Sequence, residues 1–443
     1  MSSRRDQYPA KRRFLLFIVV LGCAATGVWL YTIPPADDAT SALAIALAAI
    51  HRSDWDAAAA QLNRLHRTRP EDATVIRYAA EVAQRRGDTT AAIEWWERVS
   101  DTDLGEFGEA RLKAAQTALE VGRPQKTEQL LHSLLDKSAA VIPARRMLAR
   151  LYVVLLRITD MREQIAALDR AGQATLDELL LFTVGSRAGW ATDDHLAWLQ
   201  KCRLQEPENV EVVAALAYYL MHQNRRAEAI DLASSFSTGG PWDWMRKLVL
   251  AEDAIDQGRY SGAGDLVASL PADANRDPRV WLARGRARYE QQDWPAAQIA
   301  YAAAELLDPY DPAGAYGTAR ARHRLAGADA ARADFERADR LQQLQVREFA
   351  LLQTEQPTVE QYAKLGAAFE HVGLIREAYA CFQRVLENPS GAASPFAAES
   401  KPALSRLRAK WGQAPLHLST WAPAVWDRLN DDAAPFRGKA ASA

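Results

Sequence analysis

The stretch 277–309 contains two apolar-periodic segments of helical length, separated by a short polar turn. Trp281, Gly285 and Tyr289 lie at positions i, i+4 and i+8, so they share one face of the first segment. Because Gly285 has no side chain, a partner helix can approach closely there. The alternation of large and small residues on two short helices predicts an antiparallel helix hairpin.

The same arrangement recurs through residues 41–388, where pairs of apolar-periodic segments are joined by turn signals such as Gly122-Arg123-Pro124 and Asn224. No run of alternating apolar residues between paired turns indicates a sheet. Residues 345–355 read as an additional or lengthened helix that shifts the register. The roughly ten predicted hairpins have the spacing of a short helical repeat. They are 41–70, 72–100, 109–137, 143–171, 176–204, 208–236, 242–270, 277–309, 312–341 and 358–388.

Two of these units resemble a tetratricopeptide repeat (TPR) closely in residue type and spacing. In 277–309 the resemblance is carried by Trp281, Gly285, Tyr289, Ala297, Tyr301, Ala304 and Pro309. In 358–388 it is carried by Tyr362, Leu365, Gly366, Phe369, Gly373, Ala378 and Phe382. The resemblance implies an all-α fold, a right-handed α-solenoid of TPR-like hairpins over residues 39–388. Stacked units of that kind bury a continuous core and leave a concave face.

After the array, residues 389–411 are predicted to be a linker and a capping helix. Ser400 can cap the amino end of that helix and Pro402 suits its first turn. Leu404, Leu407 and Trp411 then form one apolar stripe for the last hairpin. Residues 412–443 are predicted to be a C-terminal tail that is partly disordered.

Residues 14–33 carry no charge over about 20 positions, which is long enough for a single transmembrane helix. The preceding residues 1–13 are basic, so we expect them to stay cytoplasmic and the repeat array to lie on the outer or periplasmic side. The lipid bilayer is thus an expected partner of residues 14–33. Two processed forms remain open: a cleaved signal peptide, and a lipoprotein modified at Cys23.

The composition argues against several functional classes. A net charge of -2 gives no general attraction for nucleic acid. The 3 cysteines are far apart, and the 8 histidines form no metal-ligand spacing, so no metal site and no cofactor is expected. Nucleotide-binding glycine loops and serine-nucleophile motifs are absent from the sequence. We therefore expect no catalytic residues and no small-molecule substrate.

Arginines cluster on the first segments of two successive hairpins: Arg279, Arg284, Arg286, Arg288, Arg320, Arg322 and Arg324. In TPR arrays the first helices line the concave groove, and the resemblance implies that Arg279, Arg286, Tyr289 and Arg324 face it here. Guanidinium groups on adjacent turns can hold a carboxylate with two hydrogen bonds. The alternative is a solvated face balanced by Glu290, Asp329 and Asp334.

The predicted function is a non-catalytic, membrane-anchored TPR scaffold of the cell envelope that binds a protein or an extended peptide in its groove. This prediction is an analogy at the level of the fold. One alternative is a structural subunit of an obligate envelope complex. Another, less favoured, is an envelope biogenesis factor of the lipopolysaccharide-assembly type. A fused catalytic domain is disfavoured because only about 50 residues follow the array.

Overall fold

The computed structural model describes residues 38–184, 192–235, 242–389 and 394–411. Within these ranges the chain forms α-helices and one 3-10 helix, and it forms no strand. The predicted basic segment 1–13, the membrane segment 14–33 and the tail 412–443 lie outside the described residues. Among the helices that are described, none combines the length and the apolar character needed to cross a bilayer.

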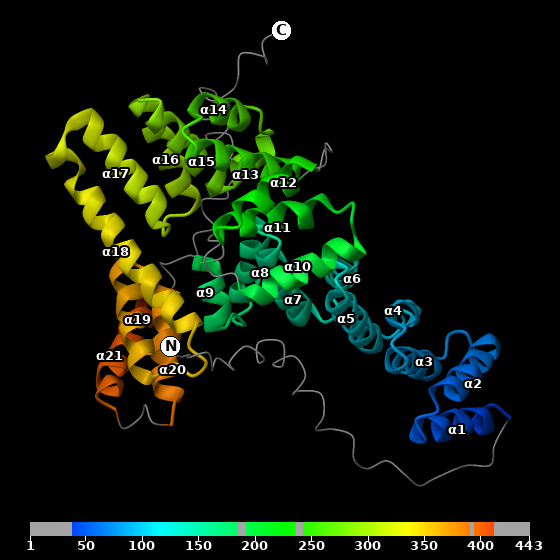
Figure 1. The fold of residues 1–443 in the computed structure, drawn as a ribbon. Helices are drawn as coiled ribbons and strands as arrows, with labels where there is room; N and C mark the ends of the chain where they lie inside the picture. The colour runs from blue at the N-terminus through cyan, green and yellow to red at the C-terminus, as the bar shows by residue number, and fades with distance from the viewer. Residues whose placement is uncertain (1–37, 185–191, 236–241, 390–393, 412–443) are drawn as a thin grey trace, which may run out of the picture. The chain divides into compact units, whose positions relative to one another are not determined.

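The chain divides into two compact units, Met1–Pro70 and Glu71–Ala443. The first unit contains one hairpin, in which α1 (Asp38–His51) packs against α2 (Trp55–Thr68). In the second unit, eight further hairpins have the helix pairs that the sequence predicts (Figure 1). The first three are α3 (Ala73–Arg85) with α4 (Thr89–Glu97), α5 (Leu104–Val121) with α6 (Pro124–Asp136), and α7 (Val141–Val154) with α8 (Ile158–Arg170). The next two are α11 (Val210–His222) with α12 (Arg226–Ser235), and α13 (Asp243–Asp256) with α14 (Tyr260–Ala268). The last three are α15 (Pro278–Glu290) with α16 (Trp294–Leu307), α17 (Pro312–Ala326) with α18 (Ala328–Leu352), and α19 (Val359–Val372) with α20 (Ile375–Glu387).

The turn residues that the sequence singles out end their helices as expected. Gly122 ends α5 in the left-handed conformation with φ 84°, where a residue without Cβ carries no steric penalty. Asn224 has φ 59° between α11 and α12, and asparagine tolerates this region better than most residues. Asp54, Asp72 and Asp88 cap the helices that follow, because each carboxylate accepts a backbone N–H of the first turn. Local sequence thus fixes where these helices begin and end.

The close helix approach expected at Gly285 is confirmed. The ring of Tyr301 on α16 lies between Gly285 on α15 and Gly317 on α17. A Cβ at Gly285 would stand 2.7 Å from Tyr301 Cδ1, and one at Gly317 would stand 2.3 Å from the same atom. Two glycines on successive first helices therefore make room for one tyrosine.

The prediction of a hairpin over residues 176–204 is wrong. Its two helices, α9 (Leu176–Val184) and α10 (Asp193–Gln205), pack against different parts of the second unit. The helix α9 contacts α8, α18 and α20, whereas α10 contacts α11 and α5. On the α10 side, Trp198 donates its indole N–H to the carbonyl of Leu119 at 2.9 Å, near the end of α5. The repeat is therefore interrupted between α8 and α11.

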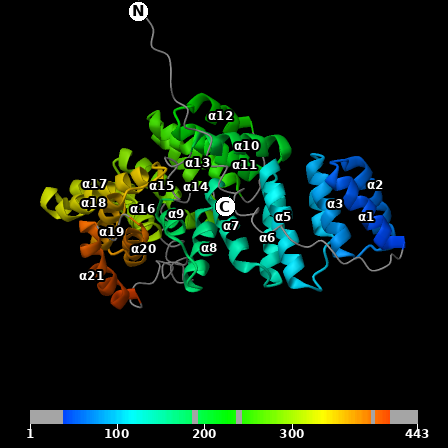
Figure 2. The same ribbon diagram turned by 90° about the horizontal axis from the view of Figure 1, so that it is seen from below.

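The end of the array also differs from the expectation. The last described helix, α21 (Pro395–Lys410), begins well before Ser400, so that Ser400 is buried inside it and donates to the carbonyl of Phe396 at 2.7 Å. Pro402 likewise lies in the helix interior. The helix packs on α20 and α19, and the three lie side by side in both views (Figures 1 and 2). The lengthening expected near residue 345 is confirmed, since α18 is one helix of 25 residues.

The helix α9 joins two apolar cores within the second unit. Leu179 and Phe182 belong to the core formed by the early hairpins, whereas Leu176 and Leu180 belong to the core of α18, α19 and α20. Near it, the buried guanidinium of Arg162 on α8 donates to the carbonyl of Leu307 at 3.1 Å and lies 2.9 Å from the Asp308 carboxylate. Helices α8 and α9 thus contact hairpins far along the sequence. We call the contact of α8 and α9 with α18, α20 and the connection between α16 and α17 the seam.

Candidate functional site

The candidate site lies on the first helices of successive hairpins, where α13 contacts α15 and α15 contacts α17. Its exposed or half-buried side chains are Arg286 on α15, and Tyr316, Arg320 and Arg324 on α17. Tyr316, Arg320 and Arg324 recur at i, i+4 and i+8, so one face of α17 presents all three. We call these four residues, together with the buried Tyr289, the basic strip.

Tyr289 is the fixed centre of the basic strip. Its hydroxyl accepts a hydrogen bond from Arg324 Nε at 3.2 Å, and the Arg320 guanidinium lies 4.0 Å from its ring centroid. The Trp294 ring packs 4.9 Å from it on the other helix of the hairpin. Burial opposes ionisation of this phenol, but the hydrogen bonds and positive charges of Arg324 and Arg320 outweigh it and lower the pKa of Tyr289. The Tyr289 side chain therefore orients the guanidinium groups of Arg320 and Arg324.

Acidic neighbours compensate part of the positive charge. Arg286 Nη2 lies 2.6 Å from Asp256 on α13, and both side chains are partly exposed. Arg320 Nη2 lies 3.6 Å from Glu290, which is beyond ordinary hydrogen-bond distance. The partner of Arg324 is a neutral phenol. Of the acidic residues that the alternative interpretation names, Asp334 pairs with Arg322 of α17 at 2.6 Å and Asp329 pairs with Arg332 of α18. Charge compensation is therefore close at Arg286 and Arg322 and weaker at Arg320 and Arg324.

Tyr316 is the exposed aromatic residue of the basic strip and lies at its α17 end. The Tyr316 side chain is 52% exposed, and its ring packs edge-on against Phe335 of α18 at 5.8 Å. The Arg320 guanidinium lies 5.9 Å from the Tyr316 ring. An exposed tyrosine beside two arginines offers a partner both apolar contact and charge. Sequence reasoning missed Tyr316, although its i, i+4, i+8 spacing with the two arginines was visible.

Arg279 does not face an open groove, which corrects the sequence-based expectation. It is 3% exposed and forms a buried ion pair with Asp277 at 2.6 Å. Its Nη2 also donates to the carbonyl of Leu156, at the turn between α7 and α8, at 2.8 Å. Arg284 is buried as well and donates to the Asn275 side chain at 2.7 Å. The structure therefore keeps Arg286, Tyr289 and Arg324 near the surface of one site and places Arg279 in the core.

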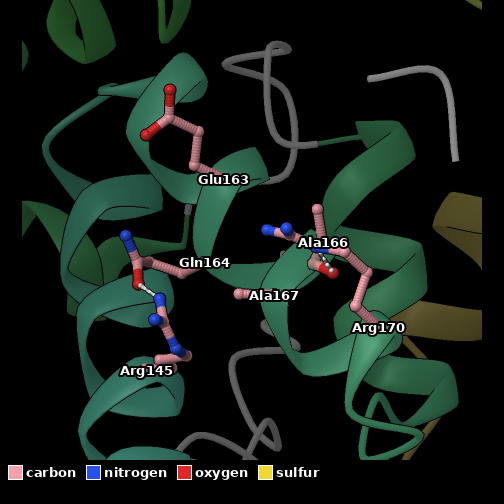
Figure 3. Close-up of a pocket in the computed structure, with 6 residues that line it drawn as sticks. All are labelled: Arg145, Glu163, Gln164, Ala166, Ala167 and Arg170. Atoms are coloured by element: carbon pink, nitrogen blue, oxygen red, sulfur yellow. Dashed lines mark hydrogen bonds between the residues drawn. The ribbon is translucent and has the colours of Figure 1, made fainter. Parts of the chain in front are cut away.

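Away from the basic strip, a hollow lies on α7 and α8, with a cavity volume of about 310 Å³ (Figure 3). Its lining residues are Arg145, Glu163, Gln164, Ala166, Ala167 and Arg170. Arg145 donates to the Gln164 side-chain oxygen at 2.8 Å, as the dashed line shows. Burial, together with the nearby Asp160, raises the pKa of Glu163. Because Arg145 is already held by Gln164 and a carboxylate lies beside it, this hollow is a weaker anion site than the basic strip.

The part of the chain that the structure describes contains no group of three or more metal-ligating side chains. Its two described cysteines, Cys202 and Cys381, are buried thiols. Burial raises the pKa of both thiols far above the usual value, so neither is poised as a nucleophile.

No family model matches the sequence, and no curated protein matches it. Similar solved structures include the TPR domain of P58(IPK), the Cut9–Hcn1 hetero-tetramer of APC/C, and yeast Tom70. Their identities to this chain are 14%, 13% and 12%, with TM-scores of 0.26, 0.27 and 0.27. The matches cover 76%, 90% and 89% of this chain, and 99%, 87% and 100% of the other chains. At these identities and TM-scores the likenesses carry no argument, and it is the pairing of the helices that defines the fold.

Proposed function

We propose that this protein is a non-catalytic scaffold that binds an acidic, extended segment of a partner protein along the basic strip. The observation that carries the proposal is the array of Arg286, Arg320, Arg324 and Tyr316 on neighbouring first helices. A peptide needs a surface longer than one helix, and adjoining first helices supply it.

The chemistry of the strip favours a carboxylate as the group that is recognised. Arg324 is held by the Tyr289 hydroxyl, so the partner meets a guanidinium whose position is already fixed. Arg320 stacks on the Tyr289 ring and keeps only a long contact to Glu290. Guanidinium groups bind carboxylates with two parallel hydrogen bonds, which lysine cannot do. An apolar or aromatic side chain next to the carboxylate would rest on Tyr316.

We further propose that residues 14–33 tether the array to a membrane, with residues 1–13 in the cytoplasm and the array on the outer or periplasmic side. The uncharged length of the segment and the basic residues before it support this arrangement. Protease treatment of spheroplasts tests it. Digestion of the array in intact spheroplasts is expected, and protection until lysis would contradict the orientation.

Charge reversal tests the basic strip. We expect Arg320→Glu with Arg324→Glu to lower partner binding at least tenfold, because two guanidinium contacts become repulsive. Arg332→Glu on α18 is the matched control, since that arginine is exposed and pairs with Asp329 in the adjacent turn. The partner would first be identified by crosslinking from a photoreactive residue at position 316 and mass spectrometry. Equal binding by the double variant and the control would refute the assignment of the strip.

A further inference from the structure

Two carboxylates are buried at the seam, where the amino end of α20 meets α8 and α18. Glu377 on α20 is 2% exposed and Glu348 on α18 is 0% exposed. Glu377 Oε1 accepts no hydrogen bond. A buried carboxylate with an unsatisfied oxygen is stable mainly in its protonated form, because its charge has lost water and gained too few donors.

The groups that surround Glu377 come from each neighbouring element. Asp169 projects from α8, Glu348 from α18, and Tyr310 from the connection between α16 and α17. From α20 itself come Cys381 and Arg376, and Arg376 forms an ion pair with Asp169. Among the charged groups on the other helices packed on α20, two interact with residues other than Glu377. Asp177 of α9 interacts with Tyr362 of α19, and Arg406 of α21 pairs with Glu370 of α19.

Arg376 does not fully compensate the acidic group around Glu377. Its guanidinium forms an ion pair with Asp169, so Glu377 shares that positive charge with a second carboxylate. Burial raises the pKa of Glu377 to about 7, and the charges of Asp169 and Glu348 add to the rise. Ionisation of Glu377 therefore falls in the physiological range of pH.

We propose that the seam is a pH-sensitive closure, held shut while Glu377 is protonated and loosened when Glu377 ionises. The buried position of Glu377 between α8, α18 and the α16–α17 connection makes the closed contact sensitive to its charge. Opening the seam would expose the apolar faces of α18 and α20 on which Leu176 and Leu180 rest. The proposal is independent of the basic strip, because its residues lie on other helices.

The direction follows from proton linkage. The closed form binds the proton on Glu377 more tightly than the open form, in which the carboxyl regains its ordinary pKa of 4.5. Closure is therefore most favoured at low pH and is weakened as the pH rises through the closed-state pKa. With a closed-state pKa of about 7, the ratio of closed to open molecules falls about tenfold between roughly pH 6 and roughly pH 8.

A distance measurement on the full chain in detergent micelles tests the proposal. Spin labels are attached at Arg150→Cys on α7 and Lys364→Cys on α19, both exposed positions, in a chain that also carries Cys23→Ser. Labelling at about pH 6 leaves the buried thiols Cys202 and Cys381 unreacted. We expect the shorter distance to dominate at that pH. At roughly pH 8 the number of molecules with the longer distance, relative to those with the shorter one, should increase about tenfold.

Two variants test whether ionisation of Glu377 causes the change in distance. Glu377→Gln keeps the side-chain shape without the charge, so we expect the short distance to persist at both pH values. Glu211→Gln removes another carboxylate whose pKa is raised, on α11, and should leave the pH response of the labels unchanged. A pH-independent distance in the parent chain, an unaltered response in Glu377→Gln, or a response lost in Glu211→Gln would each overturn the proposal.

Discussion

At the scale of the residue, small side chains decide how closely the first helices approach. Gly285 and Gly317 leave the space that the Tyr301 ring fills, and the ring is buried between α15 and α17. Burial also raises the pKa of Tyr301 to about 12, so the phenol stays neutral at physiological pH. Neither glycine requires an unusual backbone conformation, and the close approach alone explains both.

Gly317→Ala is expected to lower the free energy of unfolding by about 1–3 kcal/mol, because the added methyl group overlaps the Tyr301 ring. Chemical denaturation measures the change. Gly262→Ala on α14 is the control: nothing lies within 4 Å of its Cβ position, and alanine there should be neutral or stabilising. Equal losses in the two variants would mean that the tyrosine packing is not the cause.

Buried arginines fasten parts of the chain that are distant in sequence. Arg162 donates to the carbonyls of Phe182 and Leu307 and pairs with Asp308. Arg162→Met should cost about 3–5 kcal/mol of stability, since the Asp308 charge would remain buried without its guanidinium. Adding Asp308→Asn should recover part of that loss, and a double-mutant cycle in urea measures it. Additive losses would show that the pair is not coupled.

At the scale of the element, α9 is the helix with the most unusual role. Its nine residues contribute Leu179 and Phe182 to one core and Leu176 and Leu180 to another. Glu178 at its amino end pairs with Arg146 of α7 at 2.9 Å. Because apolar residues lie on more than one face, α9 is a bridge between cores rather than the first helix of a repeat.

Leu180→Ala is expected to lower the free energy of unfolding by about 2–5 kcal/mol, since the side chain is buried and leaves a cavity. Hydrogen exchange should then accelerate in α18 and α20 as well as in α9, because these helices share its core. Leu204→Ala on α10 is the control, as that leucine is 81% exposed. Faster exchange confined to α9 would contradict the bridging role.

At the scale of the whole molecule, the buried Glu377 and the half-buried Glu211 couple stability to pH. Burial raises the pKa of Glu211 to about 7 against the opposing charge of Arg157, and it raises the pKa of Glu377 to about 7. A raised carboxyl pKa stabilises the folded state below the ordinary value of 4.5, and this contribution is lost as the pH rises through 7.

Urea unfolding at several pH values should show this loss. We expect Glu211→Gln and Glu377→Gln each to flatten the decline in unfolding free energy between about pH 5 and about pH 8. Glu228→Gln is the control and should leave the decline unchanged, because the hydrogen bond from Arg225 lowers the pKa of this exposed carboxylate and so its titration lies below this range of pH. A decline as steep in both glutamine variants as in the parent chain would contradict the assignment.

Much of the helical organisation could be predicted from the sequence. The hairpin α15–α16, the left-handed Asn224 and the long α18 follow from residues close together in the chain. Of the residues predicted for the groove, Arg286, Tyr289 and Arg324 lie on the neighbouring helices α15 and α17, and their role in binding stays a prediction. The position of Ser400 inside α21 could not be predicted from local sequence, because its burial depends on packing against α19 and α20.

The sequence by itself determined most of the helices, many of their caps and all but one of the predicted hairpin pairings, because those features depend on contacts between near neighbours. The tertiary structure alone decided that α9 leaves the repeat, that Arg279 is buried and that the seam exists. Arg279 illustrates the reason: its carbonyl partner Leu156 lies 123 residues away, and no local pattern reports such a neighbour. The burial of Glu377, and therefore its pKa, likewise depends on helices that are distant in sequence and pack against α20.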